Sequence, residues 1–375
     1  MDDLRYQIYV GEQLPAKMIA ELVKLLAQHN TMASGNVIRL SATNIQLLRD
    51  IGCWFGLVFA SDTLIGCMIS YIQGISCGDT EYRPLTIPPG NDSEDDPGFF
   101  VPLDIDPDFG VESEDEDVPI PSTSSTSSSP PPSRASYTSY LCLASQYRSA
   151  GIAQQLIQQN LETAAVGLNY YTAARPHHGT LLELRSWFRP LNYDLARRLG
   201  FELEDSIRSR LRAEIKKPML YTNRRAGAED LHLVQTWSGG LAIKYMPTPE
   251  EWSLHCRHFL TYLVSKHGKP VCIYMLFVNP VTFSPSSRSG MVGHLSYLIF
   301  DPTTSLQDRT DALKMTSLTA QELGACVLLG YELGQLDEQL LGNMRATICR
   351  GSTFLEFRGL ESTLPHPREI NLVLF

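Results

Sequence analysis

The stretch from Tyr137 to Glu162 constrains the fold most strongly, because a strand-like run leads through a short turn into an amphipathic helix. The run is rich in aromatic, β-branched and aliphatic residues, which favours a strand. A polar turn follows from Ser145 to Gly151. Beyond it, apolar residues recur at helical spacing and face a row of glutamines (Ile152, Ala153, Leu156, Ile157 and Leu161 against Gln154, Gln155, Gln158, Gln159 and Glu162).

The turn that opens this helix has the properties of an anion site. The first N–H groups of a helix have no partners within it, and they lie at the positive end of its dipole. Arg148 in the turn adds a full positive charge. Phosphate groups bind at such helix ends. The spacing by itself also fits an ordinary strand-turn-helix unit that binds nothing, and such units are more common than anion sites.

The composition is that of a globular protein with one unusual segment. The 375 residues can form two domains or one large one. The segment between Arg83 and Arg134 holds twelve acidic and no basic residues, and without it the net charge of −10 becomes +2. We therefore expect no nucleic-acid binding, since the chain has no basic stripe. We also expect no transmembrane segment and no secretion signal, because no apolar run approaches about 18 residues and the N-terminus lacks a signal-peptide pattern.

The cysteines and histidines indicate neither disulfides nor a metal site. The eight cysteines form no C-x-x-C pair and lie mostly in apolar runs, which is typical of reduced core thiols and predicts a cytoplasmic protein. His177-His178 and the pair His255 and His258 have no clear third and fourth ligands. We expect loop histidines in the first case and helix-surface histidines in the second, and no bound metal.

Residues 84–136 are rich in acidic residues, proline and serine. Such a segment buries too little apolar surface to offset its ordering entropy. It is expected to be a disordered insertion between two strands. Two roles remain open, a solvated linker or a site of phosphorylation or partner binding.

The remaining chain alternates between strand and helix patterns. In the first half, strands are expected at 6–10, 54–59, 64–72 and 167–174 and a helix at 16–28, with 54–59 and 64–72 as a hairpin. In the second half, helices are expected at 228–237, 249–263, 306–323 and 336–344, and strands at 269–277, 291–300, 325–329, 352–357 and 370–375. Gly74 to Gly78 matches the G-x-S-x-G nucleophile pattern, but it leads into a proline-rich segment rather than a helix, so we do not assign it that role.

The central stretch resembles two related families. Gln146 to Ala153, Q-Y-R-S-A-G-I-A, fits the loose pattern with which the general N-acetyltransferase (GNAT) superfamily binds the pyrophosphate of coenzyme A. Residues 140–157 resemble the N-F-L-C-V…L-R-S-K-R-V-A-P-V-L-I segment of the eukaryotic N-myristoyltransferases. Y-T-A-A at 171–174 and the aromatic run at 185–192 resemble that family's Y-T-A-G and R-Y-W-H-R-S/P-L-N. The resemblance is clear over 137–201 and weaker over 1–82 and 228–375.

The resemblance implies a mixed α/β (α+β) fold of two fused GNAT-like acyltransferase halves around a mixed sheet. Residues 1–205 would form the half that binds acyl-CoA, 206–227 a connection, and 228–375 the half that binds peptide. We expect a monomer.

The implied reaction is transfer of myristate from myristoyl-CoA to the α-amine of an N-terminal glycine. Myristoyl-CoA would be the acyl donor, proteins that begin with glycine the acceptors, and no cofactor would be bound permanently. Two alternatives stay open. One is a non-catalytic protein that binds acyl-CoA or lipopeptides, and the other is an N-acyltransferase with a different acyl chain or acceptor.

The resemblance also implies catalytic residues. The backbone N–H groups of Tyr140 and Leu141 would stabilise the oxyanion. Thr172 would hold the amine, together with Ser139, which stands where the family has asparagine. The base would be the terminal carboxylate, which belongs here to Phe375.

The residues implied in acyl-CoA binding cluster in the turn, and one lies further on (Gln146, Arg148, Ser149, Ala150, Gly151, Ile152, Ala153 and Arg189). The family's basic pair is replaced by Ala150-Gly151, so the turn carries less charge. The acidic residues that favour a lysine in the substrate are absent at 32–35 and at Arg350, so that preference is not carried over and Arg350 would suit an acidic residue.

Overall fold

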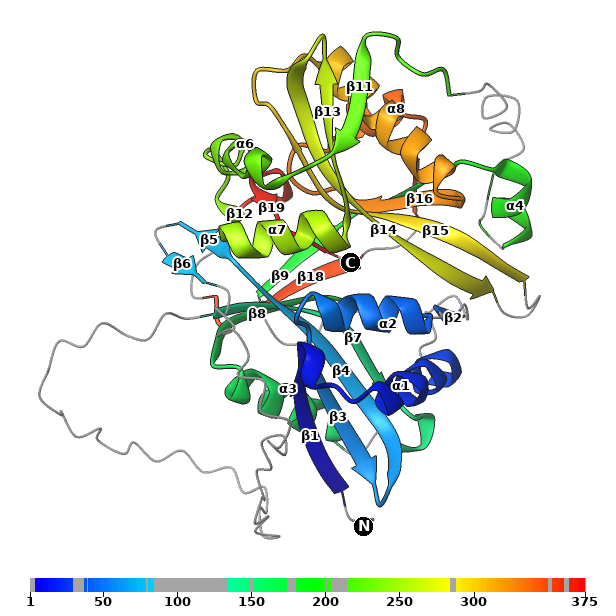
Figure 1. The fold of residues 1–375 in the computed structure, drawn as a ribbon, viewed down its shortest axis with the longest axis vertical. Helices are drawn as coiled ribbons and strands as arrows, with labels where there is room; N and C mark the ends of the chain where they lie inside the picture. The colour runs from blue at the N-terminus through cyan, green and yellow to red at the C-terminus, as the bar shows by residue number, and fades with distance from the viewer. Residues whose placement is uncertain are drawn as a thin grey trace, which may run out of the picture.

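The structure is a computed structural model, and it describes most of the chain (Figure 1). The described residues are 4–29, 37–38, 40–78, 80–83, 134–148, 151–173, 180–199, 201, 203, 215–283, 288–349, 353–360 and 364–374. They form a seven-stranded sheet, an eight-stranded sheet and a four-stranded sheet. The predicted mixed α/β class is confirmed.

The seven-stranded sheet is built around the central stretch. Its strands, in spatial order, are β1 (Leu4–Val10), β3 (Trp54–Ala60), β4 (Thr63–Gln73), β7 (Arg134–Leu143), β8 (Val166–Ala173), β18 (Thr353–Arg358) and β9 (Thr180–Leu184). Helices α1 (Ala16–His29), α2 (Ala42–Asp50) and α3 (Ile152–Thr163) accompany it. Gly56 of β3 lets α3 approach closely, because a Cβ there would lie 3.1 Å from Leu156.

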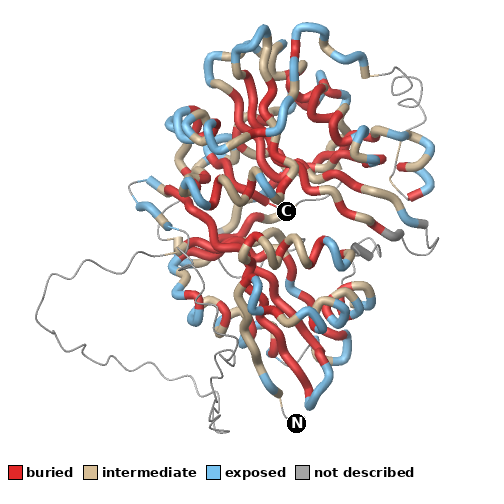
Figure 2. The backbone as a smooth tube through the Cα atoms, in the orientation of Figure 1, coloured by how far each residue is buried: buried red, intermediate tan, exposed pale blue. Residues whose placement is uncertain are grey.

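The eight-stranded sheet occupies the other half of the molecule. Its strands are β11 (Tyr221–Arg225), β13 (Leu260–Lys266), β14 (Lys269–Phe283), β15 (Arg288–Phe300), β16 (Ala325–Tyr331), β10 (Ser186–Pro190) and β17 (Thr347–Ile348), and β2 (Val37–Ile38) pairs with β14. Its helices include α8 (Leu306–Glu322), which packs on β14 and β16, with α4 (Tyr193–Arg198), α6 (Leu231–Trp237) and α9 (Glu338–Asn343). In Figure 2 the central strands of both sheets are buried, and the exposed residues gather at loops and outer helix faces.

The smallest sheet joins segments that are far apart in sequence. It contains β19 (Ile370–Asn371), β12 (Ile243–Tyr245), β5 (Ile75–Cys77) and β6 (Thr80–Tyr82). The 74–78 motif therefore contributes β5 and opens no helix. Four short 3-10 turns complete the described elements, η1 (Gly11–Gln13), η2 (Ser145–Tyr147), η3 (Ala228–Asp230) and η4 (Pro367–Glu369).

The two large sheets exchange strands. β10 comes from before residue 205 but lies in the eight-stranded sheet, and β18 comes from after residue 228 but lies in the seven-stranded sheet. The division at 205 and 228 therefore does not follow the sheets, and it stays a proposal about which half binds which substrate.

Several predicted features need correction. The strand expected at 370–375 is limited to β19, because Val373 and Leu374 make single contacts with Gln73 and Ser296 instead of a strand pairing. The helix expected at 249–263 ends at His258, giving α7 (Pro249–His258), because the alternating residues from Leu260 pair with β14 as β13. His255, expected on a helix surface, is fully buried. The insertion expected to reach residue 136 stops earlier, because β7 begins at Arg134, whose guanidinium donates to the Ala164 carbonyl. Residues 84–133, and with them the predicted disorder, lie outside the described residues.

Candidate functional site

A β-bulge and a separation of two strands lie at the centre of the seven-stranded sheet. β7 pairs in parallel with β8 only from Arg134 to Thr138. Its antiparallel register with β4 shifts so that Thr138 opposes Ser70 while Tyr140 opposes Ile69. Ser139 is therefore the extra residue of a bulge. Among the described strands, residues 139–143 pair with β4 alone, so their other edge is open at the end of β8.

The two oxyanion candidates follow this bulge directly. Tyr140 is buried, its hydroxyl lies near Asn279 of β14, and burial raises its pKa. Leu141 leaves 42% of its surface exposed, which is unusual for a leucine in the middle of a sheet. Backbone groups between a buried and an exposed side chain at an open strand edge are suited to contact a ligand.

Helix α3 begins next to this open edge with an uncapped end. Its N-cap is Gly151, whose φ of +72° is a left-handed conformation that glycine adopts without steric cost. No described side chain caps the helix, and its first turn holds no acidic residue. Ile152 is buried, which fixes the start of the helix to the core. Ser149 and Ala150 lie outside the described residues.

A groove of about 440 Å³ borders the turn on the side of α1. Its lining is mixed in character and comes from α1, the start of β4 and the turn (Glu21, Lys24, Leu25, Gln28, His29, Asp62, Thr63, Leu64, Ile65, Ala144 and Gln146). Gln146, one of the predicted acyl-CoA residues, thus lines this groove.

Arg148 binds backbone carbonyls. Its Nε donates to the Leu143 carbonyl at 3.1 Å and its Nη2 to the His29 carbonyl at 2.5 Å. These contacts fix the turn to the end of β7 and to the C-terminal end of α1. A direct contact of Arg148 with phosphate stays a prediction.

Arg189 lies in a different part of the fold from the turn. It is in β10 of the eight-stranded sheet, buried, with Nη1 donating to Ser317 of α8 at 3.1 Å. Burial, and secondarily the charge of Arg345, lowers its pKa to about 10. The structure does not bring Arg189 to the turn, because the aromatic run that contains it forms a strand paired with β16.

Thr172 and Ser139 have polar neighbours in different sheets. Thr172 is half-buried on β8, one residue past the last β7–β8 pair, and its hydroxyl lies near Tyr331 of β16. It therefore lies where the two large sheets meet. The Ser139 hydroxyl donates to the Ile69 carbonyl at 3.3 Å within its own sheet.

The eight-stranded sheet repeats the same arrangement, and sequence reasoning did not find it. β15 pairs in parallel with β16 only from Met291 to His294, and its register with β14 shifts to leave Ser296 as the extra residue. The C-terminal segment lies here, since the Leu374 N–H donates to the Ser296 carbonyl at 2.9 Å. Asn371 donates to the Leu298 carbonyl at 3.0 Å. Bulges and strand separations arise from pairing between distant segments, so no local pattern marks them.

The C-terminal segment also reaches the first half of the molecule. The side-chain amide of Gln73, the last residue of β4, donates to the Val373 carbonyl at 3.3 Å. The segment up to Leu374 is thus fixed between the two sheets. Phe375, the predicted base, lies outside the described residues.

Two further properties concern only the described part of the chain. Its histidines, cysteines and carboxylates form no group of three or more that could hold a metal ion. Within it, no helix combines the length and the apolar character needed to cross a membrane.

Comparison with known proteins identifies the fold. No protein-family model matches the chain, and neither does any curated protein. Among solved structures, N-myristoyltransferase of Saccharomyces cerevisiae with bound myristoyl-CoA superposes with a TM-score of 0.71 at 13% identity, over 99% of this chain and 89% of that one. Further structures of the yeast enzyme, with myristoyl-CoA or with myristoyl-CoA and inhibitors, give TM-scores of 0.68 and 0.67 at 12% identity, over 99% of this chain and 85% and 86% of theirs. The chain has the N-myristoyltransferase fold, which confirms the resemblance at the level of structure.

Proposed function

We propose that this protein transfers the myristoyl group of myristoyl-CoA to the α-amine of an N-terminal glycine. The observation that supports this most directly is the open edge of β7 after the Ser139 bulge, beside the uncapped N-terminus of α3. It occurs in a fold shared with an enzyme that has been crystallised with bound myristoyl-CoA.

The acyl-CoA would bind along this edge and at the helix end. The pyrophosphate would accept hydrogen bonds from the N–H groups at Gly151 to Ala153, where the helix dipole favours negative charge. Gln146 would contact the same region from its groove. The acyl chain has about a dozen methylenes at roughly 0.8 kcal/mol each, so an apolar channel supplies on the order of 10 kcal/mol.

The reaction would proceed through a tetrahedral intermediate. The amine nitrogen attacks the thioester carbonyl carbon, and the carbonyl oxygen becomes an oxyanion. Donors at Tyr140 and Leu141, on the open edge, would stabilise that charge, and one such donor is typically worth about 3 kcal/mol. The nitrogen then loses its extra proton, the carbon–sulfur bond breaks, and the sulfur of the departing coenzyme A takes up that proton.

The amine must lose a proton before it attacks, since a free α-ammonium has a pKa of about 8. We propose the carboxylate that follows Phe375 as the base. The segment that leads to it is held at Val373 and Leu374 by contacts from both halves. Thr172 and Ser139 would orient the amine. Because all eight cysteines are free thiols, we also propose a cytoplasmic location.

A second candidate is a protein that binds acyl-CoA or lipopeptides without catalysis. It is favoured by the engagement of Arg148 with backbone carbonyls and by the loss of the basic pair at Ala150-Gly151. Tight acyl-CoA binding with no turnover would support it.

Thiol release from acyl-CoAs of graded chain length, with a glycine-initiated peptide, tests the proposal. We expect peptide-dependent release of coenzyme A that is fastest with the myristoyl donor. Fastest release with another chain length would favour a different N-acyltransferase, and saturable binding without release would favour the non-catalytic protein.

A further inference from the structure

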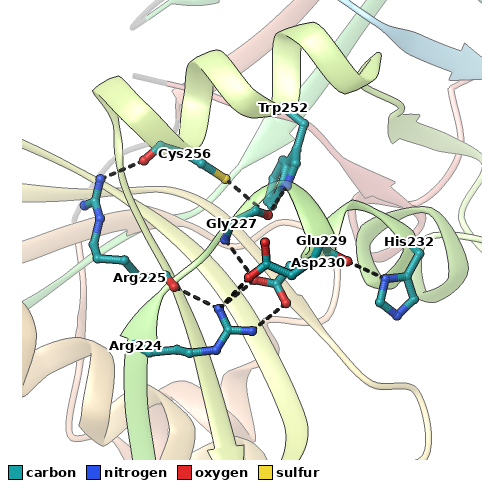
Figure 3. Close-up of polar contacts among 8 residues, drawn as sticks. All are labelled: Arg224, Arg225, Gly227, Glu229, Asp230, His232, Trp252 and Cys256. Atoms are coloured by element: carbon teal, nitrogen blue, oxygen red, sulfur yellow. Dashed lines mark hydrogen bonds and ion pairs between the residues drawn. The ribbon is translucent and has the colours of Figure 1, made fainter.

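Helix α7 connects the two halves of the molecule, and one side of it is fixed to its own half (Figure 3). Trp252 donates from Nε1 to the Gly227 carbonyl at 2.8 Å, and Arg225 donates to the Cys256 carbonyl at 2.8 Å. Nearby, Arg224 forms a two-pronged ion pair with the buried Asp230, which orders the turn that Trp252 contacts.

A neighbouring face of α7 carries two buried titratable residues, Glu251 and His255, that face the first half. The Tyr71 hydroxyl of β4 lies 3.1 Å from Glu251 Oε1 and 2.6 Å from His255 Nε2. The Gly74 N–H donates to Glu251 Oε2 at 3.1 Å. The Tyr245 hydroxyl of β12 lies 2.6 Å from His255 Nδ1. All five residues are buried.

These contacts form one consistent chain of donors. Burial lowers the pKa of His255 to about 3, so the ring is neutral, with one nitrogen donating and the other accepting. With an ionised Glu251, Tyr245 donates to His255, His255 to Tyr71, and Tyr71 to Glu251, while Gly74 supplies a second donor to the carboxylate. Fully satisfied polar networks of this kind fix geometry, because any displacement leaves a buried group without a partner.

The network fixes a close contact between β4 and β12. A Cβ at Gly74 would lie 2.1 Å from the Met246 carbonyl oxygen, and the Met246 N–H donates to the Gly74 carbonyl at 2.8 Å. Tyr245, next to Met246, belongs to β12, which pairs in parallel with β19 at the beginning of the C-terminal segment.

The same part of β4 holds both the C-terminal segment and the bulge. Gln73, between Tyr71 and Gly74, donates to the Val373 carbonyl. On the N-terminal side of Tyr71, Ser70 of β4 opposes Thr138 of β7, the residue before Ser139. A shift of Tyr71 would therefore move the C-terminal segment relative to the open edge of β7.

We propose that Glu251 and His255 are positioning residues, which hold β4 and β12 together and so fix Val373 and Leu374 relative to the Ser139 bulge. The structural part of this inference stands on the contacts alone, and its catalytic consequence rests on the proposed function. Neither residue needs to touch a substrate.

The test compares Tyr71→Phe and Tyr245→Phe with Tyr221→Phe. All three variants remove one hydroxyl and keep the ring. The control removes the hydrogen bond that Tyr221 of β11 donates to Asp308 at 2.6 Å, which is not part of the network. Hydrogen exchange is followed in the peptide that contains Val373 and Leu374, and kcat and the acyl-CoA Kd are measured in parallel.

We expect exchange in that peptide to rise about tenfold or more in both tyrosine variants and to stay near the wild-type rate in the control. We expect kcat to fall about tenfold in the tyrosine variants with the acyl-CoA Kd unchanged. Unchanged exchange in both tyrosine variants, or equal changes in the control, would overturn the inference. Exchange needs no turnover, so a wild-type protein without activity would count against the proposed function only.

Discussion

Ser139 in β7 and Ser296 in β15 occupy the same position in two different sheets. Each is the extra residue of a β-bulge, and each lies just past the point where a parallel neighbouring strand separates. At Ser296 the chain fills the gap with its own Leu374. At Ser139 the described strands leave the edge open. The same local arrangement thus holds Leu374 in one half and leaves a strand edge open among the described strands in the other.

The carboxylate after Phe375 is expected to be essential for turnover. Two or three residues appended to the chain would move the charge away from the site, while the segment up to Leu374 keeps its contacts. Turnover should fall to background and the acyl-CoA Kd should stay unchanged. A protein with an amidated Phe375, made by peptide ligation, is the matched control, because it loses the negative charge while the chain keeps its length. Normal turnover in either protein would refute the carboxylate as the base.

Charge at the N-terminus of α3 is expected to control acyl-CoA affinity. Gly151 has a positive φ and open space around its Cβ position. Asparagine and aspartate both tolerate this conformation and have nearly the same shape. Gly151→Asp should weaken acyl-CoA binding about tenfold relative to Gly151→Asn, with a smaller difference at high salt, because a carboxylate repels the pyrophosphate. Equal affinities, measured by calorimetry, would show that the phosphates bind elsewhere.

The Thr172 hydroxyl is expected to act on the acceptor amine. Thr172→Val removes the hydroxyl and keeps the shape, so kcat/KM for the peptide should fall about tenfold while acyl-CoA binding is unchanged. Thr172→Ser should retain most of the activity. Since the Thr172 hydroxyl lies near Tyr331, a Tyr331→Phe variant shows whether the effect comes from that contact alone. If Tyr331→Phe reproduces the whole loss, the hydroxyl has no direct role.

The contact between Tyr140 and Asn279 is expected to stabilise the joint of the two halves. Asn279 also accepts a hydrogen bond from Asn44 at 2.7 Å, so the three side chains form a buried chain. Tyr140→Phe should lower the free energy of unfolding by about 1 kcal/mol in urea denaturation. Tyr6→Phe, which removes an exposed hydrogen bond to Gln155, should change it by less than about 0.5 kcal/mol. Equal effects would argue against a special role for the buried chain.

Stability is expected to depend on pH through Glu251. Burial raises its pKa from 4.5 to about 7, so the folded state binds this proton more tightly than the unfolded state. The contribution of Glu251 is therefore most favourable below about pH 4.5, declines as the pH rises to 7 and is constant above that. Glu251→Gln removes this decline. Relative to wild type, the free energy of unfolding of the Glu251→Gln variant should rise by about 3 kcal/mol between pH 4.5 and 8. Parallel pH curves for the two proteins would contradict the raised pKa of Glu251.

The sequence predicted the elements whose structure depends on residues close together in the chain. The hairpin of β3 and β4, helix α1 and the turn into α3 follow from alternation, helical spacing and turn residues within short segments. His255 could not be placed this way, because Tyr71, which makes it a buried residue, is 184 positions away. β13 was misplaced for the same reason, since pairing with β14 decides it, and the place of Arg189 in β10 depends likewise on pairing with β16. The Leu374 contact with Ser296 is equally non-local.

The most direct test of the account is mass spectrometry of a glycine-initiated peptide after incubation with the pure protein and myristoyl-CoA. We predict one added myristoyl group, located on the glycine α-amine by fragmentation, and no product from the same peptide with an acetylated N-terminus. Absence of acylated peptide across a diverse set of glycine-initiated sequences, or acylation only at side chains, would contradict it.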